Sequence, residues 1–427
     1  MNYDVTGKVN AIKTDIVDTE DEELDDYDDE GLDFDSNEQQ FTEEPVEETN
    51  KNNNSGKNND LKKKLIKLMM IIGGGMLILL LILFLVSKLF TKSYNYESVE
   101  EVMKNAAESY FAEHKNSLPN DETQTVEIDV NELVNTEKMK PLDDYLGDNC
   151  GCTGRVQVKL TGATYVYIPY LTCGEKYSTK FLAEEITKDE NLVATGYGLY
   201  LMNNNSYVYR GEIVNNYLKL ESRIWRIVKV NQDKTITLIL DKAASTGYPY
   251  DDRYNKDADY DYGINNYQTS RIKEQLQLMY NETNSEEVEN YILSEKDKTH
   301  LVNYDLCISK MGKNDTIHDN SQECIQSITD KIGLLTVSDF MNASSDENCS
   351  FVTSNNCSNY NYLTQNGSFW LMTPSNKNTY SAFYVSNGTI KETSTSQTKK
   401  VRPVITLAAD TLISGGDGTE ANPFIVK

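Results

Sequence analysis

One stretch constrains the fold more than any other: the 19 residues from Leu68 to Val86 carry no charged side chain. As a helix rising 1.5 Å per residue, it nearly covers the roughly 30 Å hydrocarbon thickness of a bilayer. A cleaved signal peptide fits less well, because no small-x-small cleavage site follows the stretch. The pattern therefore predicts one transmembrane helix, contacting membrane lipid through residues 68–86, within a basic-flanked segment at residues 61–92.

Basic residues lie mainly before this apolar stretch. Five lysines between residues 57 and 67 precede it, whereas only Lys88 and Lys92 closely follow it. Basic flanks remain on the cytoplasmic side of a membrane. We therefore expect a single-pass protein of the cell membrane with a cytoplasmic N-terminus and an extracellular C-terminus.

Residues 1–60 contain 20 Asp or Glu but only 4 Lys, so this segment carries −16 of the net charge of −26. Such a composition repels itself and cannot bury a core, which predicts a disordered acidic cytoplasmic tail. Two interpretations stay open: a solvated spacer, or a docking tail for a basic cytoplasmic partner. Nucleic acid is not an expected partner, because phosphate backbones require clustered Lys and Arg.

All seven cysteines lie beyond the apolar stretch, on the predicted outer side, where disulfides form. A zinc site is disfavoured, because no Cys-x-x-Cys pair occurs and the three histidines are not spaced as ligands. Short loops favour three bridges: Cys152 with Cys173, Cys307 with Cys324, and Cys349 with Cys357. Cys150 is then left over, and it is an alternative to Cys152, because sequence alone does not fix connectivity.

Residues 93–190 read as a small α+β unit. Apolar residues recur at three- and four-residue steps over 98–113, which predicts a helix. Short β-type runs follow at 125–130, 155–160 and 164–170. A helix packed on a small sheet is the expected arrangement.

This unit resembles the globular part of type IV pilin-like and pseudopilin-like proteins of Gram-positive bacteria. The residues that suggest it are Ala106, Ala107 and Tyr110 in the helix, Leu118 and Pro119 at its exit, and Cys152, Val156 and the 165–173 hairpin strand. A prepilin has Glu five places after its Gly, whereas Gly75 is followed by Met76-Leu77-Ile78-Leu79-Leu80. The resemblance therefore implies a permanently anchored stalk and not an assembled pilus subunit.

Residues 195–427 read as a larger mixed α+β domain. Strands are expected at 206–213, 217–230, 235–240, 369–372, 382–385 and 401–407, with Gln232-Asp233-Lys234 as a turn. Helices are expected at 271–280, capped by Ser270, at 286–293, and in a short piece after Leu334.

The larger domain is similar to the C-type-lectin-like and formylglycine-generating-enzyme-like group. The matching pieces are residues 218–230 with Trp225-Arg226, Gly333-Leu334-Leu335-Thr336, Trp370-Leu371-Met372-Thr373-Pro374, Tyr384-Val385 with Asn387-Gly388, and Val401-Arg402-Pro403-Val404. Met372 stands where the family's pattern has Arg, so any ion pair made by that Arg is missing. The resemblance implies a binding scaffold without naming a ligand.

The sharpest polar cluster is Asp257, Asp259 and Asp261, followed by Gly263. Alternating carboxylates before a Gly are a weak calcium candidate. A solvated acidic loop is the favoured alternative, because the Gly is one place late and Gln268 replaces the Glu that closes an EF-hand loop. No other cofactor is expected.

No catalytic residues are expected, because neither His-Glu-x-x-His nor Gly-x-Ser-x-Gly occurs. Two Ser-x-x-Lys matches are present, at 270–273 and 396–399, and helix capping explains the first. Trp225 and Trp370 are read as core residues, with a ligand platform as the alternative.

The predicted fold class is therefore α+β, with one transmembrane helix, a small pilin-like unit and a larger domain of C-type-lectin-like type. The predicted function is non-enzymatic: a membrane-anchored bacterial surface protein that presents an extracellular binding or adhesion domain to an unknown protein or glycan. The alternative is a structural component of a pilus-like or secretion assembly.

Overall fold

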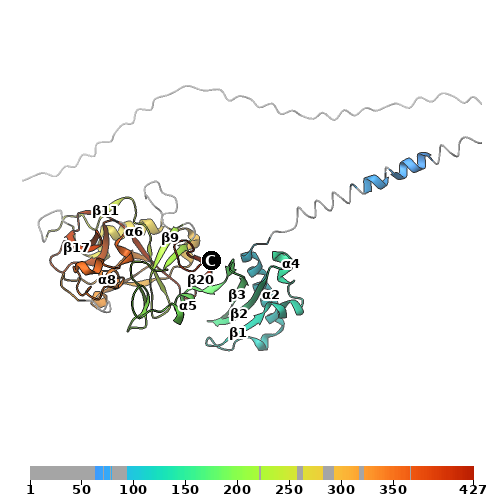
Figure 1. The fold of residues 1–427 in the computed structure, drawn as a ribbon, viewed down its shortest axis with the longest axis horizontal. Coiled ribbons are helices and arrows are strands. Elements are labelled where there is room, and N and C mark those ends of the chain that lie inside the picture. Colours follow the sequence, from blue (N-terminus) through green and yellow to red (C-terminus); the bar gives the residue numbers. More distant parts are fainter. Residues whose placement is uncertain are drawn as a thin grey trace, which may run out of the picture. The chain divides into compact units, whose positions relative to one another are not determined.

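The structure is a computed structural model that describes residues 63–70, 72–76, 78, 94–220, 223–256, 263–281, 293–316, 322–365 and 367–427. Contacts divide the chain into two units, Met1–Thr91 and Lys92–Lys427. The acidic tail at 1–60 lies outside the described residues. All of the strands described below belong to the second unit (Figure 1).

The structure contradicts the predicted transmembrane helix. Among the described residues, no helix is both long and apolar enough to cross a membrane. The transmembrane part of the predicted fold class is therefore wrong, and so is the single-pass localisation that depended on it. The mixed α+β character agrees with the prediction.

The smaller of two hydrophobic cores lies between helix α2 and a four-stranded antiparallel sheet of order β1-β2-β3-β4 (Figure 1). Helix α2 begins at a capping box, in which Asn95 and Ser98 bind each other's backbone N–H groups. Its buried side chains include Val99, Met103 and Phe111. The elements of this part are α2 Tyr96–Glu113, η1 Lys115–Ser117, β1 Thr125–Asp129, α3 Val130–Asn135, α4 Leu142–Leu146, β2 Cys152–Thr161, β3 Thr164–Cys173 and β4 Tyr177–Ser178.

The larger core surrounds a sheet whose main path runs β14-β19-β10-β9-β8-β21-β20-β5, with β7 pairing with β9 and β6 with β7. Strand β21 inserts between β8 and β20, and it runs parallel to β8. The strands are β5 Lys180–Phe181, β6 Gly198–Leu201, β7 Tyr207–Arg210, β8 Tyr217–Leu220, β9 Arg223–Val230, β10 Ile236–Leu240, β14 Ile332–Leu334, β19 Pro403–Leu407, β20 Leu412–Gly415 and β21 Phe424–Val426.

A second sheet of order β11-β18-β15-β16-β17 and the hairpin β12-β13 complete this part. These strands are β11 Gly247–Pro249, β12 Tyr304–Cys307, β13 Ser327–Asp330, β15 Phe369–Pro374, β16 Ser381–Ser386, β17 Thr389–Ser394 and β18 Thr398–Lys400. The helices are α5 Leu182–Ile186, η2 Asp189–Asn191, η3 Tyr267–Thr269, α6 Arg271–Asn281, α7 Glu295–Thr299, η4 Glu323–Ile325, α8 Val337–Asn342, η5 Asn355–Ser358 and η6 Tyr362–Thr364.

Both tryptophans lie in the larger core. Trp225 and Trp370 have no exposed surface, and the Trp370 indole donates to the carbonyl oxygen of Tyr248 at 2.8 Å. Arg402 is equally buried, and its guanidinium donates to the carbonyl oxygens of Leu240 and Asp241. These side chains are therefore core residues, as predicted for the tryptophans.

The predicted hairpin around Gln232-Asp233-Lys234 is confirmed, because β9 and β10 pair on either side of it. Lys234 takes a positive φ of 68°, which a tight turn requires. The predicted strand at 217–230 is instead two strands, β8 and β9, which pair with each other. The expected helix at 286–293 lies outside the described residues except for the buried Leu293.

The two hydrophobic cores are joined by a buried polar cluster around Glu100 of α2. The Tyr177 hydroxyl donates to the Glu100 carboxylate at 2.6 Å, and the Thr179 hydroxyl donates to its other oxygen. The ammonium group of Lys427, directly after β21, forms an ion pair with the same carboxylate. Strand β5 also pairs with β20. The larger sheet is thus tied to the helix of the smaller core.

Three disulfides are present, joining Cys152 to Cys173, Cys307 to Cys324, and Cys349 to Cys357. These are the pairs that the short loops favoured. Cys152 and Cys173 are direct partners across β2 and β3. Cys150 is the free cysteine among the described residues. Burial and the nearby Asp143 carboxylate raise the pKa of its thiol.

Peptide mapping of the full chain without reductant should therefore recover these three bridges and one thiol. Because its pKa is raised, Cys150 should react with iodoacetamide in the folded protein more slowly at pH 8 than in the unfolded protein. The measurement is the alkylated fraction of the Cys150 peptide against time. A Cys150–Cys173 bridge, or equal rates in the two states, would contradict this assignment.

Candidate functional site

A cavity of about 860 Å³ lies on the larger sheet, within the roughly 300–1,000 Å³ of sites for small ligands. Its wall comes from strands β6, β7, β9, β10, β12 and β19 and from helix α8. Several of the polar lining residues are also buried, and we call this set the floor: Ser206, Asn231, Thr237, Thr336, Asp339 and Thr406. Burying polar groups is costly unless they are hydrogen-bonded, so their concentration here needs an explanation.

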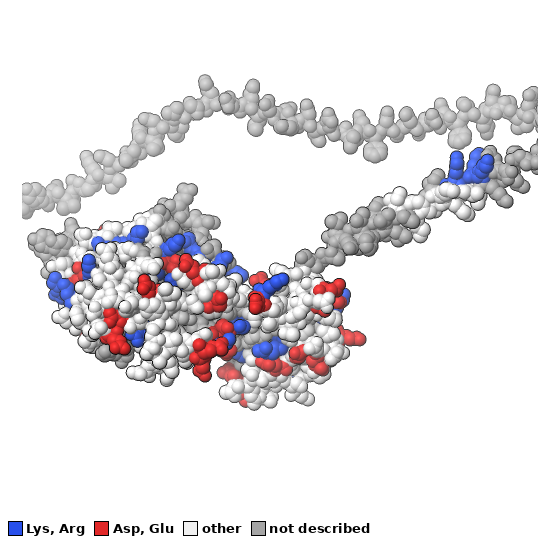
Figure 2. Space-filling model, in the orientation of Figure 1, with Lys and Arg blue, Asp and Glu red and all other residues white. Residues whose placement is uncertain are grey.

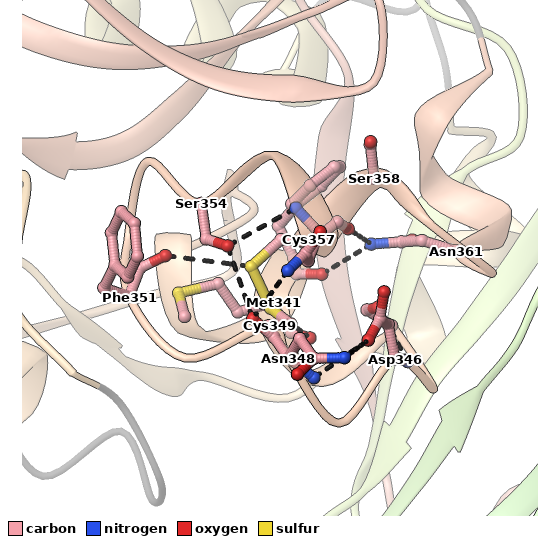
Figure 3. The surroundings of a disulfide bond; sticks show 12 residues. Met341, Asp346, Asn348, Cys349, Phe351, Ser354, Cys357, Ser358 and Asn361 are labelled. Atoms are coloured by element: carbon pink, nitrogen blue, oxygen red, sulfur yellow. Dashed lines mark hydrogen bonds between the residues drawn. A yellow bond between two sulfur atoms is a disulfide. The ribbon is translucent and has the colours of Figure 1, made fainter.

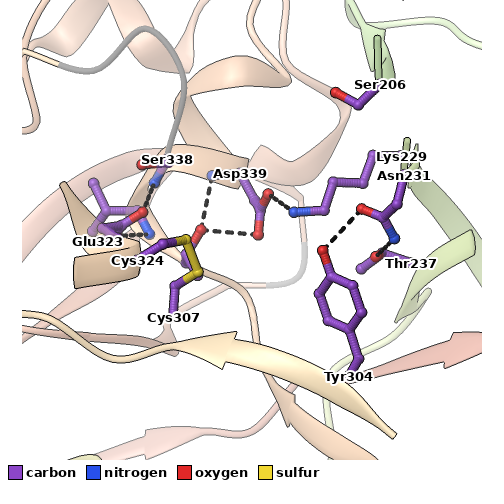
Figure 4. A network of polar contacts seen from close by, with 12 residues as sticks. Ser206, Lys229, Asn231, Thr237, Tyr304, Cys307, Glu323, Cys324, Ser338 and Asp339 are labelled. Atoms are coloured by element: carbon purple, nitrogen blue, oxygen red, sulfur yellow. Dashed lines mark hydrogen bonds and ion pairs between the residues drawn. A yellow bond between two sulfur atoms is a disulfide. The ribbon is translucent and has the colours of Figure 1, made fainter. Parts of the chain in front are cut away.

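One floor residue, Asp339, forms an ion pair with Lys229, which also lines the cavity and is largely buried. The Lys229 ammonium group of β9 lies 2.7 Å from a carboxylate oxygen of Asp339 in α8 (Figure 4). The other Asp339 oxygen accepts from the Thr336 hydroxyl at 2.9 Å. Burial works against the charge of Lys229, but the surrounding acidic groups, Asp339 foremost, together outweigh it, so the pKa of Lys229 is raised. The Lys229 ammonium group is therefore charged at neutral pH.

A neutral hydrogen-bond chain lies beside this pair. The Tyr304 hydroxyl of β12 donates to the Asn231 side-chain oxygen at 3.1 Å, and the Asn231 amide donates to the hydroxyl of Thr237 at 3.1 Å (Figure 4). Burial raises the pKa of Tyr304, which keeps the phenol protonated. The chain fixes one orientation of these groups before any ligand arrives.

Glu323 supports the cavity floor by binding the start of helix α8. It is fully buried, and its carboxylate accepts from the backbone N–H groups of Val337 at 3.1 Å and Ser338 at 3.0 Å and from the Thr373 hydroxyl. Burial raises the pKa of this carboxyl group. The contact matters because Val337 and Ser338 open α8, the helix that carries Asp339.

The predicted calcium residues Asp257, Asp259 and Asp261 lie outside the described residues. Gly263, which follows them, takes a φ of +72°, and a Cβ there would lie 1.7 Å from the carbonyl oxygen of Asp251. Close backbone approach therefore explains this glycine without a metal ion. In the described part of the chain, no group of three or more His, Cys, Asp or Glu could hold a metal ion.

Two further carboxylates, those of Asp251 and Asp252, precede the predicted calcium residues in the sequence and already have cationic neighbours. The Asp251 carboxylate binds the Arg253 guanidinium. A carboxylate oxygen of Asp252 lies 3.3 Å from the guanidinium Nε of Arg271. These contacts use the oxygens that a metal would otherwise need.

The Ser-x-x-Lys match at Ser270 has a structural role. The buried Ser270 hydroxyl donates to the Tyr267 carbonyl oxygen at 2.8 Å and accepts the N–H of Lys273 at 3.3 Å, as a helix cap does. The Lys273 ammonium group lies 3.1 Å from Asp330. Neither group is arranged as a nucleophile with its base.

The chain was compared with family models, curated proteins and solved structures. None matches. The pilin-like and lectin-like resemblances therefore rest only on the residues quoted for them, and the function has to be inferred from the cavity itself.

Sequence reasoning did not single out the floor residues. Lys229 offered one signal, since it and Arg226 are the two charged side chains within the otherwise apolar run Ile224–Val230. Its partner Asp339 lies 110 residues away. No local pattern connects positions so distant.

Proposed function

We propose that the part of the chain from residue 195 to 427 is a non-catalytic binding domain, and that the cavity on its larger sheet takes a small polar ligand. The observation that carries this proposal is the floor, where buried polar groups, most of them fixed by hydrogen bonds, line an open cavity. Polar groups held in position before binding lose little freedom when a ligand arrives. A purely structural sheet surface would gain more from apolar side chains.

The rim favours a ligand with hydrogen-bonding groups and little net charge. Apart from the Lys229–Asp339 pair, cationic side chains, anionic side chains and amides all line the cavity: Arg210, Lys331, Asp233, Asp305, Asp330, Asn203, Asn204, Gln232 and Asn342. Tyr200 and Tyr304 add flat surfaces with polar ends. On the face drawn in Figure 2, charged side chains of both signs are also interspersed. Recognition would therefore depend on short-range contacts.

The test is a binding screen of the full chain against arrays of glycans, peptides and small polar metabolites, followed by two variants. Thr406→Val and Tyr304→Phe each remove one hydroxyl group from the cavity and keep the shape of the side chain. Each lost hydrogen bond of about 1 kcal/mol should raise the Kd about fivefold. Isothermal titration calorimetry measures it.

Thr411→Val is the matched control, because Thr411 is a similarly buried threonine that does not line the cavity. Its Kd should equal that of the parent protein. A ligand whose Kd is the same in all four proteins, or the absence of any ligand on the arrays, would refute the cavity as the binding site.

A further inference from the structure

Two disulfides of the larger core differ in their surroundings. Cys307 and Cys324 both line the cavity, and Cys324 is exposed (Figure 4). Cys357 is fully buried beside Asn361, whose amide donates to the carbonyl oxygens of Cys357 and Phe340 at 2.9 Å each (Figure 3). Cys349 is partly exposed, so each bridge has one partly exposed cysteine, but only the first has a fully exposed one at which a soluble reductant can attack.

The Cys307–Cys324 disulfide is adjacent in sequence to Glu323, the residue that supports the cavity floor. Cys324 follows Glu323, the fully buried residue whose carboxylate accepts the N–H groups of Val337 and Ser338. The backbone also joins the two sides here, because Ser309 N–H donates to the Glu323 carbonyl oxygen at 2.9 Å. The disulfide and this backbone hydrogen bond therefore both restrain Glu323 in its position at the start of α8.

From this geometry we infer that the Cys307–Cys324 disulfide is a redox switch, whose reduction releases Glu323 from α8 and separates the Lys229–Asp339 pair on the cavity floor. Only the expected consequence of reduction, a change in ligand affinity, rests on the proposed function. The chain of contacts itself exists without a ligand.

The reductant is a dithiol. It supplies two electrons and two protons, so the Sγ–Sγ bond breaks, thiols form on Cys307 and Cys324, and the dithiol closes to its own disulfide. Burial raises the pKa of Glu323, which shows that its charged form is held in an unfavourable place. Once the covalent tether is gone, the carboxylate gains hydration by moving outward, and α8 loses the acceptors for its first N–H groups.

The test needs no ligand. The full chain is studied in three forms: oxidised, treated with dithiothreitol, and as Cys307→Ser/Cys324→Ser. Hydrogen exchange followed by mass spectrometry reports on the backbone of α8, and acetic anhydride probes the accessibility of the Lys229 amine. Exchange across Val337–Asn342 and acetylation of Lys229 should both become at least tenfold faster without the bridge.

Cys152→Ser/Cys173→Ser is the matched control, because its bridge joins β2 and β3 of the smaller core and does not contact α8; it should leave both rates unchanged. Glu323→Gln, with every disulfide intact, should speed exchange in α8 by itself, because its amide N–H group cannot accept the Ser338 N–H. Unchanged rates in protein whose two thiols are demonstrably free would overturn the inference. Loss of protection in β9 and β19 as well would also overturn it, since that result means global unfolding.

The binding arm separates this inference from the proposed function. If an array ligand depends on Thr406 and Tyr304 but binds equally to oxidised and reduced protein, the cavity is the site and the switch is refuted. If the exchange and acetylation rates change as expected but no ligand is found, the switch stands and the proposed function fails.

Discussion

Replacing Lys229 with Met should lower the free energy of unfolding by about 3–5 kcal/mol, because the substitution leaves the Asp339 carboxylate buried without its counter-charge. The side chains of Lys229 and Asp339 are only 12% and 8% exposed, so water offers little compensation. The double variant Lys229→Met/Asp339→Leu removes both charges and should recover most of this loss. Urea denaturation followed by circular dichroism measures each value.

The control for this cycle is the exposed pair of Lys104 and Glu101, with atoms 3.7 Å apart and side chains 38% and 60% exposed. Lys104→Met should change stability by less than about 1 kcal/mol. If Lys229→Met lowers the free energy of unfolding no more than Lys104→Met does, the Lys229–Asp339 pair stabilises the protein no more than an exposed ion pair. A double variant as unstable as the single one would show that lost packing, and not the unpaired charge, is responsible.

The second large effect is expected at Glu100. Replacing it with Ala removes the carboxylate that accepts from Tyr177 and Thr179 and pairs with Lys427, at a cost of about 3–5 kcal/mol. Because Glu100 belongs to the smaller core and Lys427 directly follows β21 of the larger sheet, the loss should also weaken the coupling between the cores. Differential scanning calorimetry should then resolve two transitions for this variant, whereas we expect a single transition for the parent protein.

Lys427→Met tests the origin of this coupling. It leaves Glu100 with two hydroxyl donors, so its cost should be smaller than that of Glu100→Ala, while the separation into two transitions should remain. A single transition in both variants would place the coupling in the β5–β20 pairing instead.

Local features were predictable because their signals are local. The three- and four-residue recurrence of apolar residues predicted the helix that the structure shows as α2, and the turn residues before Thr235 predicted the β9–β10 hairpin. The preference for short loops favoured the same three disulfide pairs that the structure contains, although it left Cys150 open as an alternative to Cys152.

The remaining errors have physical reasons. Hydropathy measures composition alone: the composition of residues 68–86 predicted a membrane span, whereas no helix among the described residues is both long and apolar enough to be one. The break between β8 and β9 was missed because Glu221-Ser222 contains none of the usual hairpin-turn residues. The cavity floor was missed because β9, β12 and α8 meet only through tertiary packing, which no periodicity reports.

The strand order of the larger sheet also has a consequence for synthesis on the ribosome. Strand β10 is hydrogen-bonded on one side to β9, its immediate predecessor, and on the other to β19, whose first residue is made 163 residues after Leu240. At typical translation rates this delay is on the order of ten to thirty seconds. Strand β8 waits still longer for β21. Throughout that interval the nascent chain presents two unpaired β-edges, which are templates for aggregation, so holdase chaperones that bind extended apolar segments should associate with it before release.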